Sequence, residues 1–245
     1  MAHGHFAWTD LSTFDMKAAR ADYTALFGWA FHGDPTYDFA TQNGTEVAAV
    51  FPMPPRLAAI NMPSFWMSYV HVPDVSATLA KARTHHGVII EVEPQPFGDN
   101  AQIALVRDPS GAGFTLYEGP DIRDVGTVAH RYHHLPAVAL IETFYADLFG
   151  WTFELAANTP WPTFAIRHPD GTTIAHAEEV PETILGTLRY WMPAFAVGSL
   201  QATAERIAAR GGQTVVELPG DRLMLVDRQG AHFMVCASSP AAAHR

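Results

Sequence analysis

The chain has 245 residues and a formal net charge of −10, from 25 acidic and 15 basic side chains. This length allows one or two domains with cores of their own, and the acidic balance argues against a nucleic-acid partner, which needs a basic face. No apolar run reaches membrane-spanning length, so no membrane partner is expected, and the single cysteine, Cys236, favours a reducing cytoplasm.

In the first half of the chain, alternating apolar residues and turn residues predict two modules, each of one strand, one helix and three more strands. The strands are predicted at 6–11, 29–31, 37–41, 46–51, 65–72, 88–92, 102–107 and 113–118, and the helices at 16–27 and 74–86. Asp15 is expected to cap the first helix and Gly87 to end the second. Residues 52–63 are rich in proline and predict a loop, either a packed connector or a lid over a pocket.

The second half repeats this plan after residues 119–127, which lack apolar periodicity and are expected to link two domains, 1–121 and 127–245. Its strands are predicted at 130–135, 151–155, 163–167, 173–177, 190–197, 213–218, 222–226 and 231–236, and its helices at 136–149 and 199–210. The tail from residue 237 onward is expected to be disordered.

Three short blocks recur in the same order in both halves, which indicates a duplicated domain. Residues 145–153, YADLFGWTF, repeat residues 23–31, YTALFGWAF, and the glycine of each block suits the left-handed residue that ends a helix. The pair Trp66-Met67 recurs as Trp191-Met192, and the turn that begins at Asp108 recurs at Asp227, each time as Asp-x-x-Gly-Ala-x-Phe.

Four such modules paired into two domains resemble the vicinal oxygen chelate superfamily, which includes glyoxalase I, the bleomycin-resistance proteins and the extradiol dioxygenases. The resemblance rests on the helix end at 144–150, the turn at 108–111 and Gly211-Gly212 after a helix that follows an opening strand. It implies an α+β fold of two tandem domains, each with two paired βαβββ modules whose curved mixed sheets surround a cleft. It also implies a small-molecule ligand, and a monomer or homodimer, since the chain already supplies the domain pair.

In the metal-dependent members, the resemblance implies one ligand from the opening strand and one from the closing strand of each module. Divalent metals prefer imidazole, thiolate or carboxylate ligands. In this chain the positions fall on Trp8, Met67 and Thr115 in the first domain, and on His130, His176, Met192 and Met234 in the second. No cofactor is therefore expected; if a divalent metal does bind, its ligands are His130, His176 and Glu178.

Three candidate site residues of the second domain lie on its first predicted strand. Because side chains alternate along a strand, His130, Tyr132 and His134 share one face, which the resemblance turns toward the cleft. His130 and His176 are the candidates for a general acid or base, and Tyr132 and His134 for ligand binding. The alternative is that these are hydrogen-bonded structural histidines.

Aromatic side chains supply the remaining candidates for ligand contact. Trp8, Asp10, Trp66 and Tyr69 would form an aromatic wall with one carboxylate in the first domain, and Trp191 stands at the repeated position in the second. Such tryptophans and tyrosines also fill cores, and that alternative stays open.

These features lead to three functional hypotheses. The first is a glyoxalase/bleomycin-resistance-like protein that binds a small organic molecule and has a degenerate metal site. The second is a metal-dependent lyase, isomerase or dioxygenase that uses His130 and His176. The third is a non-catalytic protein that sequesters a drug or metabolite. No phosphate-binding loop, dinucleotide fingerprint or nucleophile elbow is present in the sequence.

Overall fold

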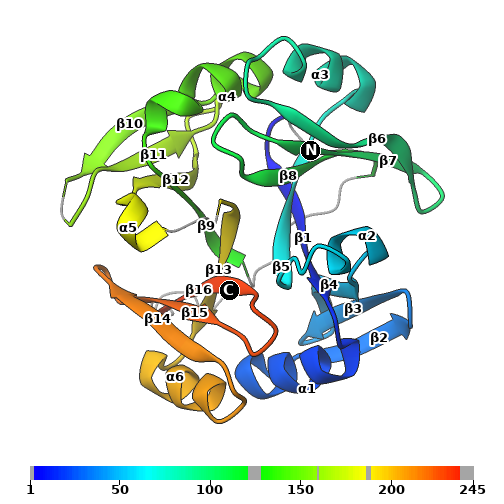
Figure 1. Ribbon diagram of the computed structural model, residues 1–245, viewed down its shortest axis with the longest axis vertical. Coiled ribbons are helices and arrows are strands. Elements are labelled where there is room, and N and C mark those ends of the chain that lie inside the picture. Colours follow the sequence, from blue (N-terminus) through cyan, green and yellow to red (C-terminus); the bar gives the residue numbers. More distant parts are fainter. Residues whose placement is uncertain (1–2, 121–127, 159, 186–188, 238–245) are drawn as a thin grey trace. The chain divides into compact units, whose positions relative to one another are not determined.

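The computed structural model describes residues 3–120, 128–158, 160–185 and 189–237, and the predicted tail lies largely outside them. Within these residues the chain forms two eight-stranded mixed sheets (Figure 1). The strand order is β2-β3-β4-β1-β5-β8-β7-β6 in the first sheet and β10-β11-β12-β9-β13-β16-β15-β14 in the second. The two orders are the same with every strand number raised by eight, so the two halves of the chain have the same architecture and the predicted fold class is confirmed.

The first sheet takes its elements from the first half of the chain. They are β1 (Phe6–Thr13), α1 (Met16–Phe27), β2 (Ala30–Asp34), β3 (Tyr37–Gln42), β4 (Thr45–Pro52), α2 (Pro55–Ala58), β5 (Phe65–His71), α3 (Val75–Ala82), β6 (Ile89–Phe97), β7 (Ala101–Arg107) and β8 (Gly113–Glu118). The predicted helix at 16–27 is confirmed, and Asp15 caps it by accepting a hydrogen bond from the Ala18 N–H.

The second sheet repeats this order with small local changes. Its elements are β9 (Val128–Leu135), the 3-10 helix η1 (Val138–Leu140), α4 (Glu142–Phe149), β10 (Thr152–Ala157), β11 (Thr163–Arg167), β12 (Thr173–Glu179), α5 (Glu182–Leu185), β13 (Trp191–Val197), α6 (Leu200–Ala208), β14 (Gln213–Leu218), β15 (Arg222–Val226) and β16 (His232–Ala237). The glycines that end α1 and α4 have φ values of +74° and +71°, which confirms the left-handed helix ends predicted from the repeat.

Three predictions about helices were wrong in detail. The proline-rich segment 52–63 contains the one-turn helix α2, because Pro55 can occupy a first helical position, where no N–H is needed. Helix α3 ends at Ala82, since the His85 N–H donates to the Ala82 carbonyl and closes a tighter turn before Gly87 is reached. In the second half, α4 begins only at Glu142, because Ala137 is still extended, at φ −158°, and a 3-10 turn follows it.

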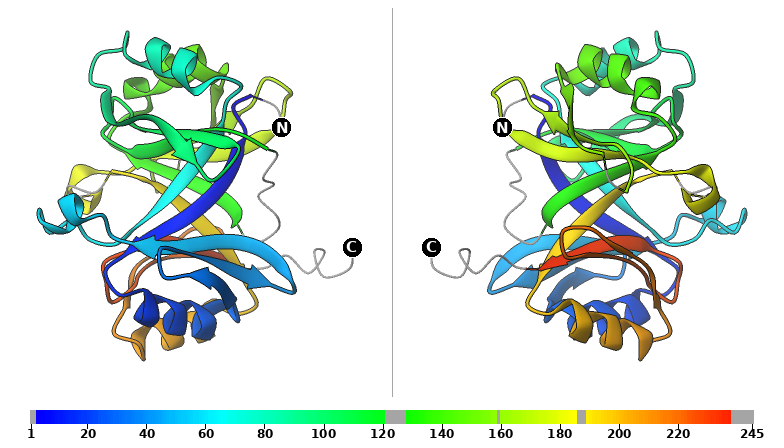
Figure 2. Two further views of the ribbon diagram at one scale, coloured as in Figure 1. Left: turned by 90° about the vertical axis from the view of Figure 1, so that its right-hand side faces the viewer. Right: turned by 90° about the vertical axis from the view of Figure 1, so that its left-hand side faces the viewer.

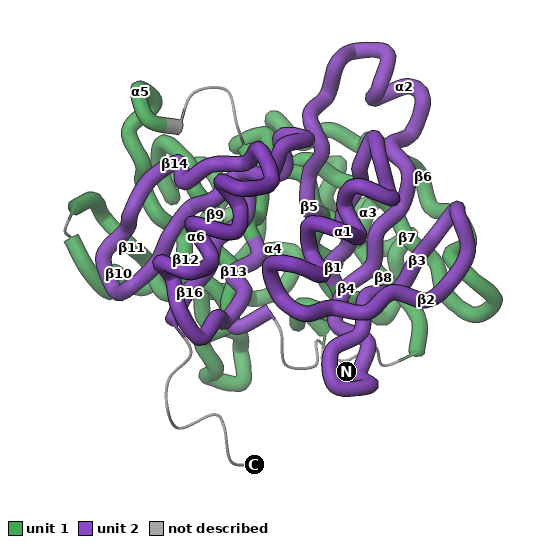
Figure 3. Tube along the Cα trace, turned by 90° about the horizontal axis from the view of Figure 1, so that it is seen from below, with its two compact units in different colours: residues 1–8, 67–124, 130–192 green, residues 9–66, 125–129, 193–245 purple. Residues whose placement is uncertain are grey.

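The chain divides into two compact units that combine modules from both halves (Figure 3). Unit 1 comprises residues 1–8, 67–124 and 130–192, and unit 2 comprises residues 9–66, 125–129 and 193–245. The boundary passes through β1, β5, β9 and β13. Residues 121–127 lie outside the described residues, so the domain limits 1–121 and 127–245 stay a prediction.

Each unit has its own apolar core and its own pair of packed helices. In unit 1, α3 lies beside α4 (Figure 2), and the largest buried side chains include Phe114, Phe144 and Trp151. In unit 2, α1 lies beside α6, and Trp29 and Phe195 pack edge to face with their ring centroids 5.4 Å apart. No helix among the described residues is long and apolar enough to cross a membrane.

Candidate functional site

The predicted histidines of the second half come together on one face of two neighbouring strands in unit 1. Strands β9 and β12 pair in parallel, with Tyr132 opposite His176 and His134 opposite Glu178. Because side chains alternate along each strand, His130, Tyr132 and His134 share this face with His176 and Glu178. The register therefore brings together five of the candidate residues from positions far apart in the sequence.

An imidazole pair forms the more exposed part of this face. His130 Nε2 and His176 Nδ1 are hydrogen-bonded at 2.5 Å, and the Tyr132 ring stacks on His176 with centroids 5.9 Å apart and an interplanar angle of 19°. All three side chains are half-buried. One nitrogen of the pair donates to the other, so the two rings act as a single polar unit with one side still reachable from solvent.

The next pair along the same strands is fully buried. His134 Nε2 lies 2.8 Å from Glu178 Oε2, and the two side chains are 2% and 0% exposed. A buried carboxylate needs a charged or hydrogen-bonding partner, and His134 is the charged partner when its ring is protonated. The two atoms lie at ion-pair distance without forming a hydrogen bond.

The structure also tests whether the superfamily ligand positions of the four modules are equivalent. In each module, the residue two places after the opening-strand position pairs with the closing strand. These pairs are Asp10 with Ala49, Tyr69 with Thr115, Tyr132 with His176, and Ala194 with Met234. The position pairs are therefore Trp8/Ala49, Met67/Thr115, His130/His176 and Met192/Met234. Among these four, His130/His176 alone offers imidazole nitrogens.

A hydrogen-bonded chain on the opposite face of β9 was missed in the sequence. His133 Nε2 lies 2.7 Å from Asp108 Oδ2, the Tyr145 hydroxyl donates to the same oxygen at 2.9 Å, and Trp191 Nε1 donates to the Tyr145 hydroxyl at 2.9 Å. All four side chains are buried. The signal was available, because Tyr145, Trp191 and Asp108 belong to the three repeated blocks.

The same chain recurs in unit 2 without the histidine. Trp66 Nε1 donates to the Tyr23 hydroxyl at 3.1 Å, and this hydroxyl donates to Asp227 Oδ2 at 3.0 Å. Tyr132 in β9 and Asp10 in β1 are the equivalent paired residues of the two opening strands. The residue after Tyr132 is His133, and the residue after Asp10 is Leu11. The three repeated blocks thus encode one buried Trp-Tyr-Asp chain per unit.

The histidine changes the electrostatics of the two aspartates. Burial alone would raise the pKa of Asp108, but the charge and hydrogen bond of His133, with hydrogen bonds from Ser110 and Tyr145, lower it below its ordinary value. The pKa of Asp227 is raised, mainly by burial and also by the nearby Asp22 carboxylate. Burial also raises the pKa of Tyr23 and Tyr145 well above the ordinary value. The surroundings of Asp108 therefore stabilise its ionised form, whereas those of Asp227 destabilise the ionised form.

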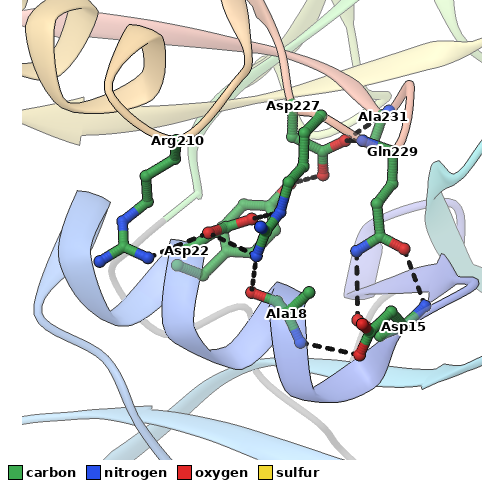
Figure 4. Close-up of polar contacts among 9 residues, drawn as sticks. Asp15, Ala18, Asp22, Arg210, Asp227, Gln229 and Ala231 are labelled. Carbon is green, nitrogen blue, oxygen red and sulfur yellow. Dashed lines mark hydrogen bonds and ion pairs between the residues drawn. The ribbon is translucent and has the colours of Figure 1, made fainter.

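Asp22 belongs to a polar cluster on helix α1 in unit 2 (Figure 4). Its carboxylate accepts from Arg210 Nη1 at 3.2 Å and from Arg228 Nε at 2.8 Å, and Gln229 exchanges hydrogen bonds with the backbone of Asp15. These contacts hold α1 against α6 and the β15–β16 turn, which gives the cluster a structural role.

The aromatic candidates lie in buried positions within their units. In unit 1, Trp8 is 3% exposed and Tyr69 is 5% exposed, with the Tyr69 ring against those of Phe97 and Tyr117. In unit 2, Asp10 is fully buried and accepts a hydrogen bond from the Tyr37 hydroxyl at 3.1 Å. Trp66 and Trp191 form the buried chains described above. A ligand role for these residues stays a prediction.

A hollow of about 600 Å³ lies elsewhere, at the end of α1 and the start of α6 in unit 2. Its walls include Phe27, Gln42, Ser199 and Arg206, and the predicted site residues are not among them.

Comparison with known proteins agrees with this architecture. Residues 4–116 match the family model described as Glyoxalase/Bleomycin resistance protein/Dioxygenase superfamily. "Putative glyoxylase CFP32" from Mycobacterium tuberculosis (strain CDC 1551 / Oshkosh) is 31% identical, over 95% of this chain and 94% of that protein. "Anthracycline biosynthesis protein DnrV" from Streptomyces peucetius is 29% identical, over 96% of this chain and 93% of that protein.

Solved structures share the fold at lower sequence identity. An extradiol ring-cleaving dioxygenase from B. fuscum matches with a TM-score of 0.63 and 15% identity, over 95% of this chain and 71% of that one. The Mn(II)-bound glyoxalase from Novosphingobium aromaticivorans matches with a TM-score of 0.55 and 14% identity, over 97% and 88%. With two halves of βαβββ modules and a 31% identical relative along nearly its whole length, the chain belongs to the glyoxalase/bleomycin resistance protein/dioxygenase superfamily.

Proposed function

We propose that the protein binds a small organic molecule against the exposed side of the His130–His176 pair, without the divalent metal that some superfamily members use. The observation that carries this proposal is the contrast between the two pairs on the β9–β12 face. His134 and Glu178 are buried, with Nε2 and Oε2 2.8 Å apart, whereas the His130–His176 pair is half-buried and keeps a solvent-accessible side. Polar side chains that converge and remain accessible are typical of ligand sites.

The residues at the superfamily ligand positions do not fit a divalent metal. A catalytic zinc site uses three protein ligands, from histidine, cysteine or carboxylate side chains. The four equivalent position pairs supply two imidazole nitrogens, and their other members are tryptophan, alanine, threonine and methionine. The nearest carboxylate on the same face, Glu178, is engaged by His134. The four position pairs therefore supply two ligands where a catalytic zinc site uses three.

The chemistry of the face favours a flat ligand with a polar or anionic substituent. The imidazole pair can donate or accept a hydrogen bond, and an unperturbed imidazole changes charge near pH 6.5. The Tyr132 ring, stacked on His176, adds an aromatic surface beside that polar pair. The name of the S. peucetius relative, an anthracycline biosynthesis protein, supports an oxygenated aromatic compound as the ligand class.

A titration with an anthracycline and with a single-ring catechol tests this proposal. Tight binding of either one is expected, and His130→Asn or His176→Asn should weaken it about tenfold or more, since a hydrogen bond to a charged group contributes roughly 1.5–3 kcal/mol. His32→Asn, in unit 2 and 55% exposed, is the matched control and should leave affinity unchanged. Affinity that is the same in all variants, or no binding of any oxygenated aromatic compound, would contradict the proposal.

The imidazole pair also supports a second candidate, an enzyme of the lyase, isomerase or dioxygenase type in which one of the two histidines moves a proton. Two hydrogen-bonded imidazoles can hold a proton at one nitrogen and release it at another. Turnover of a bound compound, lost in His130→Asn and His176→Asn, would identify an enzyme. Binding without turnover would identify a sequestering protein. A monomer or homodimer in the cytoplasm is our expectation in both cases.

A further inference from the structure

Histidine replaces aspartate at a turn that recurs in the fold. Asp108, His168 and Asp227 each begin a turn before the last strand of a module, and the backbone N–H of each donates to the carbonyl four residues later, at 2.9, 2.9 and 3.0 Å. Each side chain also accepts a hydrogen bond from the backbone N–H two residues later. His168 thus uses its Nδ1 where the two aspartates use a carboxylate oxygen.

The surroundings of His168 fix which of its nitrogens carries the proton. Its Nε2 lies 2.8 Å from the carbonyl oxygen of His3, and a carbonyl can only accept, so Nε2 is the donor. Its Nδ1 lies 3.2 Å from the backbone N–H of Asp170, and so accepts from it. The side chain is 7% exposed, so solvent hardly competes with these contacts. With Nε2 as the donor to His3, Nδ1 is the ring nitrogen that faces Asp170.

A carboxylate faces this nitrogen. Asp170 Oδ1 accepts from the backbone N–H and the hydroxyl of Thr172, at 2.8 and 2.7 Å, and these bonds hold the pKa of Asp170 well below its usual range. Its other oxygen, Oδ2, lies 3.0 Å from His168 Nδ1 and 3.0 Å from His5 Nε2. Nδ1 and Oδ2 are therefore close enough to bind one cation together, either a proton or a metal ion, and Nδ1 would then exchange the Asp170 N–H for that cation.

We propose that His5, His168 and Asp170 bind a divalent transition-metal ion, with zinc as the best fit. The three ligand atoms lie within 4.8 Å of one another. Zinc–nitrogen and zinc–oxygen bonds of about 2.0–2.2 Å in a tetrahedron place neighbouring ligand atoms about 3.3–3.5 Å apart, so the Asp170 oxygen, 3.0 Å from each nitrogen, needs a small outward shift. The two imidazole rings, whose centroids are 3.8 Å apart, would also have to separate. Two imidazoles and one carboxylate are a ligand set that zinc accepts.

Two further features suit a metal site. The His168 ring donates its second N–H to a backbone carbonyl, which is the usual outer contact of a metal-binding histidine and fixes the ring for ligation. The Asp170 side chain is 44% exposed and that of His5 is 25% exposed, so water can supply the fourth ligand. The ion would join the segment before β1 to the β11–β12 turn within unit 1. This site is separate from the His130–His176 pair, and it does not depend on the proposed ligand function.

Titration of untagged, chelator-treated protein with Zn²⁺ and Co²⁺ tests the site. We expect about one equivalent to bind, the visible absorption of four-coordinate Co²⁺, and a rise in melting temperature of roughly 5–10 °C when the free ion exceeds Kd about 100-fold. Asp170→Asn and His5→Gln should each weaken binding at least about tenfold. Asp170→Asn keeps an oxygen for Thr172, so the turn itself should persist, and the melting temperature of each metal-free variant checks this.

The double variant His130→Asn/His176→Asn is the matched control and should bind the ion as the unchanged protein does. Uptake below about 0.1 equivalent would overturn the proposal and leave a proton as the cation between His168 and Asp170. Uptake that survives Asp170→Asn and His5→Gln but is lost in the control variant would place the ion at the His130–His176 pair, and would also overturn it. Binding of the ion at the His130–His176 pair would also contradict the proposal that this pair binds its ligand without a metal. Uptake below about 0.1 equivalent would leave that proposal intact.

Discussion

Asparagine at Asp108 should destabilise the protein far more than asparagine at Asp227, although the two residues occupy equivalent turns. Asp108 Oδ1 accepts from the backbone at Ser110 and Ala112, and the amide oxygen of asparagine can keep those bonds. The second oxygen, however, becomes an NH₂ group that faces His133 and leaves the Tyr145 hydroxyl proton without its acceptor. The change removes a buried charge pair as well as a hydrogen bond.

The magnitudes follow from these lost contacts. Removing one partner of a buried ion pair costs about 3–5 kcal/mol, and because asparagine keeps the backbone hydrogen bonds of the turn, we expect about 3 kcal/mol for Asp108→Asn. Asp227→Asn loses the acceptor for the Tyr23 hydroxyl, about 1 kcal/mol, but also relieves repulsion from Asp22, so we expect at most about 1 kcal/mol. The first variant should therefore melt roughly 6–12 °C lower at pH 7, and the second roughly 0–4 °C lower.

The pH dependence of the two variants should have opposite signs. The folded pKa of Asp108 is lowered, so its contribution to stability is full above the unfolded value of about 3.9 and is lost as pH falls through the folded pKa. The cost of Asp108→Asn should thus shrink in acid. The folded pKa of Asp227 is raised, so the natural protein gains stability relative to Asp227→Asn as pH falls from 7 through that pKa.

Urea unfolding followed by circular dichroism and tryptophan fluorescence, at several pH values, measures both differences. The comparison uses the shift in midpoint at unchanged slope, provided that the two units unfold in one transition. Equal costs for the two variants at pH 7, or the same sign of pH dependence, would refute the role assigned to His133.

Two other predictions concern the same repeated blocks. Gly150→Ala should cost about 1 kcal/mol more than Gly28→Ala in thermal melts: both glycines have positive φ, but a Cβ at Gly150 would meet Pro169 Cγ at 2.9 Å and one at Gly28 would meet nothing within 4 Å. An equal loss of stability in the two variants would contradict this prediction and show that Pro169 moves aside without cost. Tyr145→Phe should cost about 1–3 kcal/mol in urea unfolding, because the buried Trp191 N–H loses its acceptor, and a change below about 0.5 kcal/mol would contradict that contact.

The sequence was a good guide to local elements and to the fold. Alternation and turn residues predicted every module, and the repeat predicted the left-handed ends of α1 and α4. The register of β9 and β12 brings His130 and His176 into contact. These features depend on residues close together in the chain, or on the equivalence of modules. The same patterns could not exclude the short helix α2, whose proline-rich sequence is also compatible with an irregular loop.

Long-range pairing is what the sequence did not predict. Alternation assigns His133 and His134 to opposite faces of β9, but it does not say that Asp108 and Glu178 lie opposite them. Both histidines are consequently buried beside a carboxylate, and His134, expected to line a cleft with His130 and Tyr132, lies deeper than those two. The cluster that His168 and Asp170 form with His5 was missed for the same reason, because His5 lies far from the other two residues in the sequence.

The division of the chain into units has a consequence for its synthesis on the ribosome. Unit 2 joins the first module to the last, and the hydroxyl of Tyr23 finds its acceptor only in Asp227, 204 residues later. Contacts of such long range form slowly, and the first module cannot complete its core before the last module has been synthesised. A chain truncated before β16 would therefore leave apolar surface of the first module exposed.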